Sequence, residues 1–131
     1  MKTSCLFCEI QEIDRKRIVA ESSLGYVIRD GFPVTPGHTL VIPKRHAETF
    51  FDLTEGELLA CNRLLHEQRE AILREDGAVQ GFNIGMNAGA AAGQTVFHCH
   101  IHLIPRRVGD VENPRGGVRH VIPGKGFYEA K

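Results

Sequence analysis

The chain has 131 residues, of which 42% are hydrophobic and 24% charged, a balance typical of one soluble globular domain. This composition excludes disorder along the whole chain, which needs fewer apolar residues. Sixteen basic and sixteen acidic side chains give a net charge of zero, so no general positive field attracts nucleic acid or an anionic membrane. Any phosphate must therefore be bound locally.

No apolar stretch approaches the ~18 to 20 residues that span a bilayer. The N-terminal sequence MKTSCLFCEI becomes charged too early for a secretion signal. We therefore expect a cytoplasmic protein that has neither a membrane nor a nucleic acid as a partner.

Four cysteines, Cys5, Cys8, Cys61 and Cys99, need an explanation other than structural disulfides, which rarely form in a reducing compartment. Cys61 lies within an apolar helical pattern and is interpreted as a small hydrophobic residue. Cys5 and Cys8 form the motif CLFC, whose two thiolates can bind one metal ion. Two thiolates do not complete a structural zinc site, so such a site needs two further ligands elsewhere in the chain.

Short apolar segments separated by turn residues predict strands along the chain. The first two form a predicted hairpin around Ser22 and Ser23. A third follows the turn signal Pro36-Gly37 and ends at Pro43. The five predicted strands span residues 18–20, 25–28, 38–43, 81–87 and 96–105.

One long amphipathic helix is predicted between the third and fourth strands. Thr54 and Glu57 have the spacing of a capping box, which satisfies backbone N–H groups of the first turn. Apolar residues then recur every three or four positions up to a predicted end near Glu75. Additional leucines widen this stripe, and they fit either the core of the same chain or the surface of a dimer partner.

This order of elements predicts an α+β domain with a mainly antiparallel sheet. From Arg106 onward the chain becomes rich in glycine, proline and basic residues. We therefore divide the single domain into a body, residues 1–107, and an extended C-terminal tail, residues 108–131. The tail is expected to lie on the surface, where a partner subunit can order it.

Three histidines alternate with other residues in the last predicted strand, so His98, His100 and His102 would share one face of it. Such a row is compatible with two chemistries. Histidines two apart can bind a catalytic zinc ion, or one neutral ring nitrogen can attack phosphorus as a nucleophile. No carboxylate lies in the strand or in the preceding loop to orient the ligands of a catalytic metal.

The loop before this strand, residues 87–95, has the sequence NAGAAAGQT and carries no charge. Its small side chains allow backbone N–H groups to approach a phosphate closely. Asn87, Gln94 and Thr95 can add side-chain hydrogen bonds to phosphoryl oxygens. Next to the histidines, this loop favours phosphoryl or nucleotidyl transfer over a merely flexible connection.

The segment GQTVFHCHIHLIPRR resembles the signature of the histidine-triad (HIT) family. The segments CLFCEI and PGHTLVIPKRH resemble the same family in the same order, so the likeness covers about residues 5–107. The resemblance implies a HIT-like fold: an antiparallel sheet of about five strands with one long and one short helix. It also implies a homodimer in which the two sheets join into one.

The resemblance also implies roles for particular residues. His100 would attack the α-phosphorus of a nucleotide and form a nucleotidyl-histidine that water resolves, while His102 and His38 would flank the phosphate and ease departure of the leaving group. The remaining matches to the family's nucleotide site are Asn87, Gln94 and Thr95 for phosphate oxygens, Asp30 for the ribose hydroxyls, and Phe7 and Ile10 for the purine base. Phe7 and Ile10 fit equally well as plain core residues.

In the zinc-bearing branch of the family, a C-x-x-C motif, a downstream histidine and the first histidine of the triad bind one zinc ion. Cys5, Cys8, His46 and His98 match that pattern. Four protein ligands close the tetrahedron, so the implied zinc, one per chain, is structural. No catalytic metal and no organic cofactor are expected.

The activity implied is hydrolysis of dinucleoside polyphosphates, such as diadenosine tetraphosphate, because the Pro105-Arg106 pair after the triad resembles that branch of the family. The alternative enzyme is a purine nucleoside phosphoramidase, which uses the same intermediate and a nitrogen leaving group. A nucleotide-binding regulatory dimer with incidental turnover is a further alternative.

Overall fold

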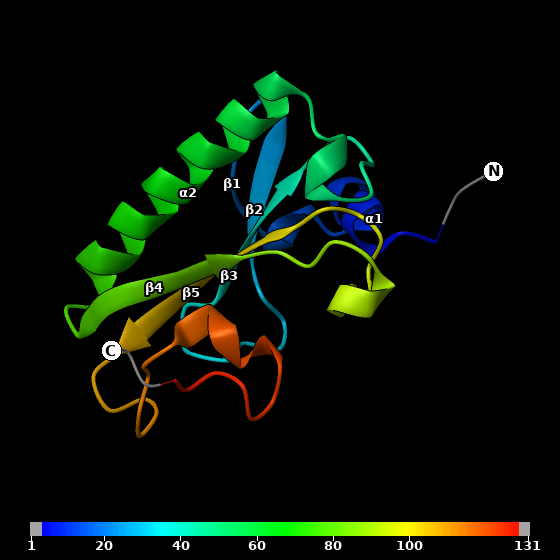
Figure 1. Cartoon of the computed structure of the whole chain (residues 1–131). Coiled ribbons are helices and arrows are strands. Elements are labelled where there is room, and N and C mark those ends of the chain that lie inside the picture. The colour runs from blue at the N-terminus through cyan, green and yellow to red at the C-terminus, as the bar shows by residue number, and fades with distance from the viewer. Residues whose placement is uncertain (1–3, 129–131) are drawn as a thin grey trace.

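The computed structural model describes residues 4–128. At its centre is an antiparallel sheet in which the strand order is β1-β2-β3-β5-β4 (Figure 1). The strands are β1 Ile18–Glu21, β2 Gly25–Arg29, β3 Thr39–Pro43, β4 Val79–Gly85 and β5 Ile101–Arg107. The helices are α1 Leu6–Ile13 and α2 Glu55–Glu75, with short 3-10 helices η1 Arg15–Arg17, η2 Phe50–Asp52, η3 Ala90–Ala92 and η4 Gly117–Val121. These elements confirm the predicted α+β class, the hairpin and the pair of one long and one short helix.

The long helix α2 covers one face of the sheet (Figure 1). The predicted capping box is confirmed: Thr54 Oγ1 accepts from Glu57 N at 3.1 Å, and the Glu57 carboxylate accepts from Thr54 N at 2.8 Å. Cys61 and Leu64 of α2 are buried in a core cluster with residues of β2, β3 and β5. None of the helices within residues 4–128 has the length and apolar character that crossing a bilayer requires.

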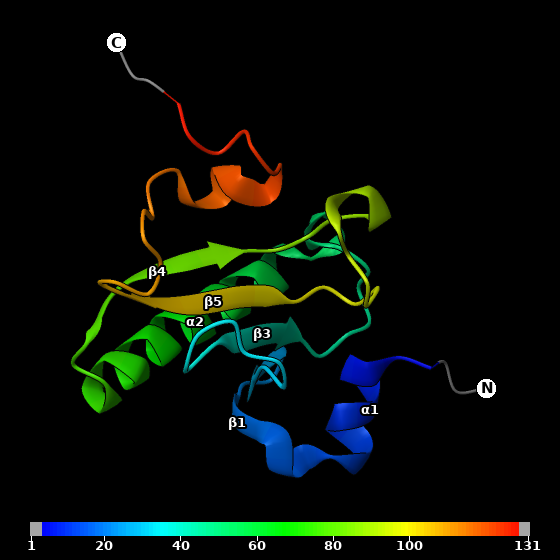
Figure 2. The same ribbon diagram turned by 90° about the horizontal axis from the view of Figure 1, so that it is seen from below.

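The opposite face of the sheet is divided between the two ends of the chain (Figure 2). Near the N-terminus, α1 buries Phe7 and Ile10 in a core cluster with Tyr26, Ile28, Leu40 and Ile42 of β2 and β3. The segment after β5 lies over β4 and β5. His102 lies where these two coverings meet, because it lines one cavity with α1 residues and another with η4 residues.

β5 begins later than predicted, so of the three triad histidines only His102 lies in the strand. Residues 96–100 make hydrogen bonds to the end of β3 and the loop after it. Cys99 N donates to Ala47 O at 2.7 Å, and the His98 ring donates from Nε2 to Pro43 O at 2.7 Å. The predicted row of three displayed imidazoles is therefore wrong for His98, which is completely buried.

The C-terminal segment is more folded than the extended tail that the sequence suggests, because η4 (Gly117–Val121) coils part of it. His120 Nε2 donates to Arg115 O at 2.8 Å, and Arg119 Nε donates to Gly126 O at 3.1 Å. These bonds connect residues on both sides of η4. The segment thus makes its own internal contacts while it lies on the sheet.

Candidate active site

The structure brings three predicted catalytic histidines together on the sheet face opposite α2. His102 lies in β5 in register with Leu40 of β3, and His38 directly precedes β3. His38 Nε2 and His102 Nδ1 are 2.9 Å apart, and the ring centroids of His100 and His102 are 5.3 Å apart. The antiparallel pairing of β3 and β5 therefore joins residues that are far apart in the sequence.

Hydrogen bonds define which ring nitrogens of His38 and His102 carry protons. Val34 N donates to His38 Nδ1 at 3.1 Å, so that nitrogen is an acceptor and Nε2 carries the proton. His38 Nε2 then donates to His102 Nδ1, with the Asp30 carboxylate 3.4 Å from the same nitrogen. A neutral His102 consequently carries its proton on Nε2, the nitrogen that this chain of bonds leaves available to a ligand.

Burial keeps both rings of this pair uncharged near neutral pH. Burial, together with the positive charges that His100 and His38 can carry and against the opposing effect of Asp30, lowers the pKa of His102 to about 4. Burial also lowers the pKa of His38, against the opposing effect of the nearby Asp30 carboxylate. The pair thus acts as a chain of neutral hydrogen-bond donors and acceptors.

His100 is oriented by the backbone of its neighbour in the triad. Its Nδ1 lies 2.8 Å from the carbonyl oxygen of His98, which can only accept, so Nδ1 carries a proton. In the neutral ring Nε2 is then unprotonated and has a lone pair. The ring of Phe7 packs 4.9 Å from that of His100, centroid to centroid, and restricts its position from the α1 side.

His100 and His102 line a cavity of about 560 Å³, here named the His100 cavity. This volume lies within the range of pockets that bind small molecules and cofactors. Predicted site residues that also line it are Phe7, Asp30, Asn87 and Thr95. An apolar wall with a carboxylate and the histidines suits a ligand that combines a flat base, a sugar and a phosphate.

Asp30 is held in place at the wall of this cavity. Its Oδ1 accepts from Phe32 N at 2.7 Å, while Oδ2 lies 3.4 Å from His38 Nε2. Carboxylate oxygens have lone pairs to spare after these contacts and can accept from ribose hydroxyls. The ring of Phe32 is 92% exposed and also lines the cavity.

Two predicted ligand-binding residues do not line the His100 cavity. Gln94 is buried, and its amide nitrogen donates to Glu48 O at 2.7 Å and Val96 O at 3.1 Å, while its oxygen accepts from Gly89 N at 2.8 Å. All its polar atoms are committed to the backbone, so it fixes the 87–95 loop instead of contacting a phosphate. Ile10 is 1% exposed and belongs to the core cluster under α1.

Several residues that line the His100 cavity have no function predicted from the sequence, among them Leu6, Arg17, Ile28, Phe32 and Leu40. The alternation of side chains along a strand could have predicted Ile28 and Leu40. They lie two residues from Asp30 and His38, so they are on the same face of the sheet as these site residues. No local pattern marks Arg17, which approaches the cavity from η1.

A second cluster joins the N-terminus to the start of the triad. The ligand atoms of Cys5, Cys8, His46 and His98 all lie within 4.8 Å of one another. Sulfur-to-nitrogen distances of 3.3, 3.4 and 3.5 Å match the spacing of about 3.6 Å expected for tetrahedral zinc with bonds of ~2.3 Å to sulfur and ~2.1 Å to nitrogen. His98 donates from Nε2 to Pro43 O, which leaves Nδ1 as the ligand atom. The residues therefore fit a structural zinc ion.

Asp30, His38 and His102 also place ligand atoms within 4.8 Å of one another. The hydrogen bond between the two histidines and the 3.4 Å contact of Asp30 with His38 explain these separations. His38 Nε2 and His102 Nδ1 share a proton at 2.9 Å, and a metal at this position would have to displace it. This trio is thus a hydrogen-bonded histidine pair with a carboxylate beside it, and its chemistry differs from that of the sulfur-containing cluster.

Comparisons with known proteins agree with this arrangement. Residues 11–109 match the HIT domain. The solved Zn-bound histidine triad family protein from Mycobacterium smegmatis is 40% identical, with 82% of this chain and 78% of that one covered and a TM-score of 0.73. A HIT family protein from Bacillus anthracis is 35% identical, with 100% and 83% covered and a TM-score of 0.74. The adenylylsulfatase HINT3 of Arabidopsis thaliana is 34% identical over 84% of this chain and 56% of its own length.

The match to the family extends over most of the chain and includes His38, His100 and His102. The fold agrees with that of the solved Bacillus anthracis protein over the whole length of this chain. This chain belongs to the HIT family of histidine triad proteins.

Proposed function

We propose that this protein hydrolyses nucleotides by transferring a nucleotidyl group first to His100 and then to water. The observation that carries the proposal is the 2.8 Å hydrogen bond from His100 Nδ1 to the carbonyl oxygen of His98. It leaves Nε2 with a free lone pair on a ring that lines a nucleotide-sized cavity.

In the first step the Nε2 lone pair attacks the α-phosphorus. A phosphorus–nitrogen bond forms, and the bond to the leaving group breaks with its electron pair on the departing atom. His102 Nε2 donates a hydrogen bond to the phosphate and stabilises the charge that develops. In the second step water attacks the same phosphorus and loses a proton to solvent. A phosphorus–oxygen bond forms, and the phosphorus–nitrogen bond breaks with its electron pair returning to His100 Nε2.

The charge state of His102 favours substrates whose leaving group departs without a proton. Its low pKa, about 4, means that the ring has no extra proton to give near neutral pH. A phosphate chain leaves as a stable anion, whereas an amine must take up a proton to leave. Dinucleoside polyphosphates such as diadenosine tetraphosphate are therefore the proposed substrates, with purine phosphoramidates as poorer ones.

The zinc ion proposed for Cys5, Cys8, His46 and His98 would have a structural role. When bound, it would supply four strong bonds that fix the N-terminus to the chain beside His100. The chain itself would still orient His100, through the His98 carbonyl and the Phe7 ring. The Zn-bound relative from Mycobacterium smegmatis supports this assignment.

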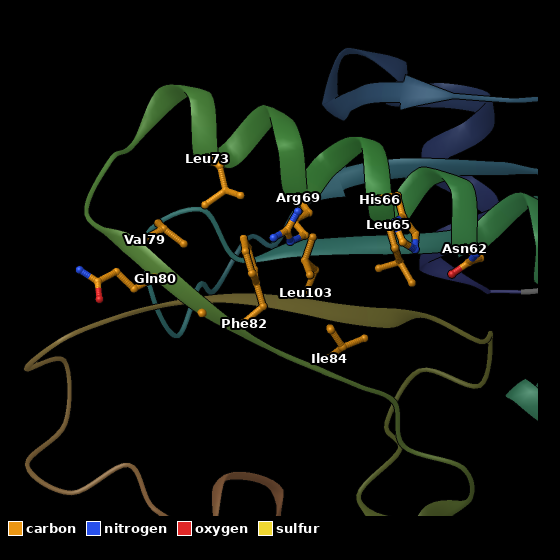
Figure 3. Close-up of a pocket in the computed structure, with 11 residues that line it drawn as sticks. Asn62, Leu65, His66, Arg69, Leu73, Val79, Gln80, Phe82, Ile84 and Leu103 are labelled. Atoms are coloured by element: carbon orange, nitrogen blue, oxygen red, sulfur yellow. The ribbon is translucent and has the colours of Figure 1, made fainter.

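We also propose a homodimer formed through the edge of the sheet. β4 is a terminal strand in the sheet order, and a groove of about 580 Å³ lies between it and α2. Figure 3 shows Leu65 and Leu73 of α2 on one side of this groove and Phe82 and Ile84 of β4 on the other. An unpaired edge strand beside an apolar groove can pair with the same strand of a second copy. Light scattering during size-exclusion chromatography would give the mass of a monomer if this proposal is wrong.

Two variants of the nucleophile test the proposed reaction. We expect His100→Gly and His100→Ala to lose at least about a thousandfold in kcat on diadenosine tetraphosphate, because no other group can form the covalent intermediate. Added imidazole should restore part of the activity of His100→Gly, in which it can occupy the vacated space, and less of that of His100→Ala.

Detection of the nucleotidyl-histidine intermediate tests the proposed reaction directly. Rapid acid quenching of wild-type enzyme should trap a nucleotidyl group on the peptide that contains His100, detected by mass spectrometry. Full turnover by both variants would overturn the nucleophile assignment. Tight nucleotide binding by the wild type without any turnover would instead favour the regulatory dimer.

A further inference from the structure

A second cavity, of about 750 Å³, lies next to the His100 cavity and is here named the tail cavity. Both cavities are lined by His102 and Asn87, so they meet at the position proposed for the reacting phosphate. Residues of β4 and β5 line the tail cavity together with residues of the C-terminal segment. Figure 2 shows this segment beside the two strands. The mechanism proposed above leaves this cavity without a role.

The walls of the tail cavity are mainly apolar. Met86 and Ile104 contribute from the sheet side, and Val118 and Val121 contribute from η4. Val118 is 63% and Val121 76% exposed, although both line the cavity. An apolar ligand would cover these side chains and remove their surface from water.

The charge in this cavity does not suit a terminal phosphate. Arg106 is the single lysine or arginine among the described residues that line it. Its guanidinium already makes a bidentate contact with Asp110, at 2.8 Å for each bond, and a 2.6 Å bond to Asn83 Oδ1. The positive charge is therefore neutralised within the wall, and the cavity favours an uncharged group.

The cavity also has the length to hold more than a phosphate. It extends along β5 from His102 to Arg106, which is roughly 13 Å at ~3.3 Å per residue. A ligand bound in both cavities would therefore place its phosphates near His102 and Asn87. The part of the ligand beyond the phosphates would lie against the apolar wall.

The C-terminal segment is held in the conformation that builds this wall. The hydrogen bonds from His120 to Arg115 and from Arg119 to Gly126 join its two sides. Gly116 has a φ of +95°, and a Cβ at this position would lie 2.6 Å from Gly126 O. A wall that is already folded costs less conformational entropy when a ligand binds.

We propose that the tail cavity is a leaving-group subsite that binds the second nucleoside of a dinucleoside polyphosphate, with its base against Val118 and Val121. The inference rests on the proposed function, because it assumes that the phosphate reacts between the two cavities. It assigns the C-terminal segment to substrate selection. The same chain then provides both nucleoside sites, one on each side of His102.

The test compares two substrates that share a tetraphosphate chain and differ only in the second nucleoside: diadenosine tetraphosphate and adenosine 5′-tetraphosphate. The measured quantity is the ratio of their kcat/KM values. We expect Val118→Asp and Val121→Asp each to lower this ratio about tenfold or more, since a carboxylate in an apolar subsite opposes binding of the base. Ile122→Asp is the matched control, because Ile122 is 58% exposed in the same segment and does not line the cavity.

The outcomes separate this inference from the proposed function. Absence of a nucleotidyl adduct on His100 with either substrate would overturn both. If the adduct forms but the ratio of kcat/KM values is the same in Val118→Asp, Val121→Asp and Ile122→Asp, the subsite alone is overturned. An unchanged ratio with a change in oligomeric mass would show that a second copy covers the cavity, which also contradicts the proposal. Melting temperatures near that of the wild type would verify that the variants are folded.

Discussion

The carbonyl oxygen of His98 accepts a hydrogen bond from His100 Nδ1 at 2.8 Å, while the side chain of the same His98 lies 3.3 Å from the Cys5 sulfur. One residue therefore belongs to both the proposed zinc site and the support of the proposed nucleophile. Any movement of the His98 backbone changes the direction of the His100 ring. This relationship predicts that loss of the proposed structural zinc ion would slow the proposed reaction through the position of His100.

Removal of zinc should slow the reaction without abolishing it. A displacement of the nucleophile by about 1 Å can cost up to ~100-fold in rate, so we expect kcat to fall about 10- to 100-fold in chelated protein. The nucleotidyl adduct on His100 should still form, only more slowly. The measurements are metal content, kcat and melting temperature on the same sample before and after chelation. An unchanged kcat in metal-free protein would contradict the link through His98.

Gln94 and Thr95 are neighbours that should respond differently to substitution. Gln94→Ala removes a buried amide that bonds three part-buried backbone groups, so we expect a loss of about 1–3 kcal/mol in the free energy of unfolding. Thr95 is exposed and lines the His100 cavity, so Thr95→Ala should raise KM with little effect on stability. Urea unfolding and steady-state kinetics on both variants check this. Equal stabilities would show that Gln94 does not hold the loop.

The contrast between Gln94 and Thr95 shows what the sequence can and cannot predict. Local patterns are sufficient for α2, whose start is determined by Thr54 and Glu57 three residues apart. Local patterns do not by themselves predict the pairing of β3 with β5, which brings His38 to His102. The family resemblance is needed to supply that strand order. Gln94 binds Glu48, 46 residues away, and no local pattern contains that information.

The same limit explains why β5 begins at Ile101 and not at residue 96 as predicted. Residues 96–100 alternate as a strand does, but their hydrogen bonds go to Pro43 and Ala47. Such long-range contacts override local preference. The folded C-terminal segment is a similar case, since it depends on contacts such as that between Arg119 and Gly126.

Asp30 should recognise the ribose through its hydroxyl groups. A hydrogen bond to a carboxylate is worth ~1.5–3 kcal/mol, so wild-type enzyme should prefer ribonucleotide over 2′,3′-dideoxynucleotide substrates by about 10- to 100-fold in kcat/KM. Asp30→Ala should lose most of this preference. Because Asp30 also lies near His38, the variant is expected to be slower on both substrates. The ratio separates the two effects, and an unchanged preference in Asp30→Ala would exclude the ribose contact.

His102 should make the fold less stable in mild acid. Its pKa is lowered from 6.5 to about 4 by burial, so between these values the unfolded chain binds a proton that the folded chain does not. Stability from this residue is therefore present above pH 6.5 and is lost as the pH falls towards 4. We expect the melting temperature to drop over this range, and to drop less in His102→Gln, which does not titrate. An equal drop in both proteins would show that other groups cause it.

The Arg45–Glu57 pair should stabilise the start of α2 more than a surface ion pair does. The Glu57 side chain is almost fully buried and accepts two bonds from Arg45, at 2.8 and 2.9 Å, which together with the capping bond lower its pKa to about 2. Arg45→Ala leaves a buried carboxylate without its partner and should lower the urea midpoint clearly. The matched control is Arg15→Ala, which breaks the exposed pair with Glu21 and should have a small effect.

The pH dependence of the stability difference between wild type and Arg45→Ala tests whether the Arg45–Glu57 interaction is electrostatic. A carboxyl group with a lowered pKa stabilises the fold above its unfolded value of about 4.5, and this stability is lost as the pH falls through about 2. The gap between wild type and Arg45→Ala should therefore be constant from pH 7 to 5 and should narrow below pH 4. Because His46, a proposed zinc ligand, follows Arg45 directly, Arg45→Ala should also weaken zinc retention, and Arg15→Ala should not. A gap that persists unchanged at pH 2 would mean that Arg45 stabilises the fold by packing and not by its charge.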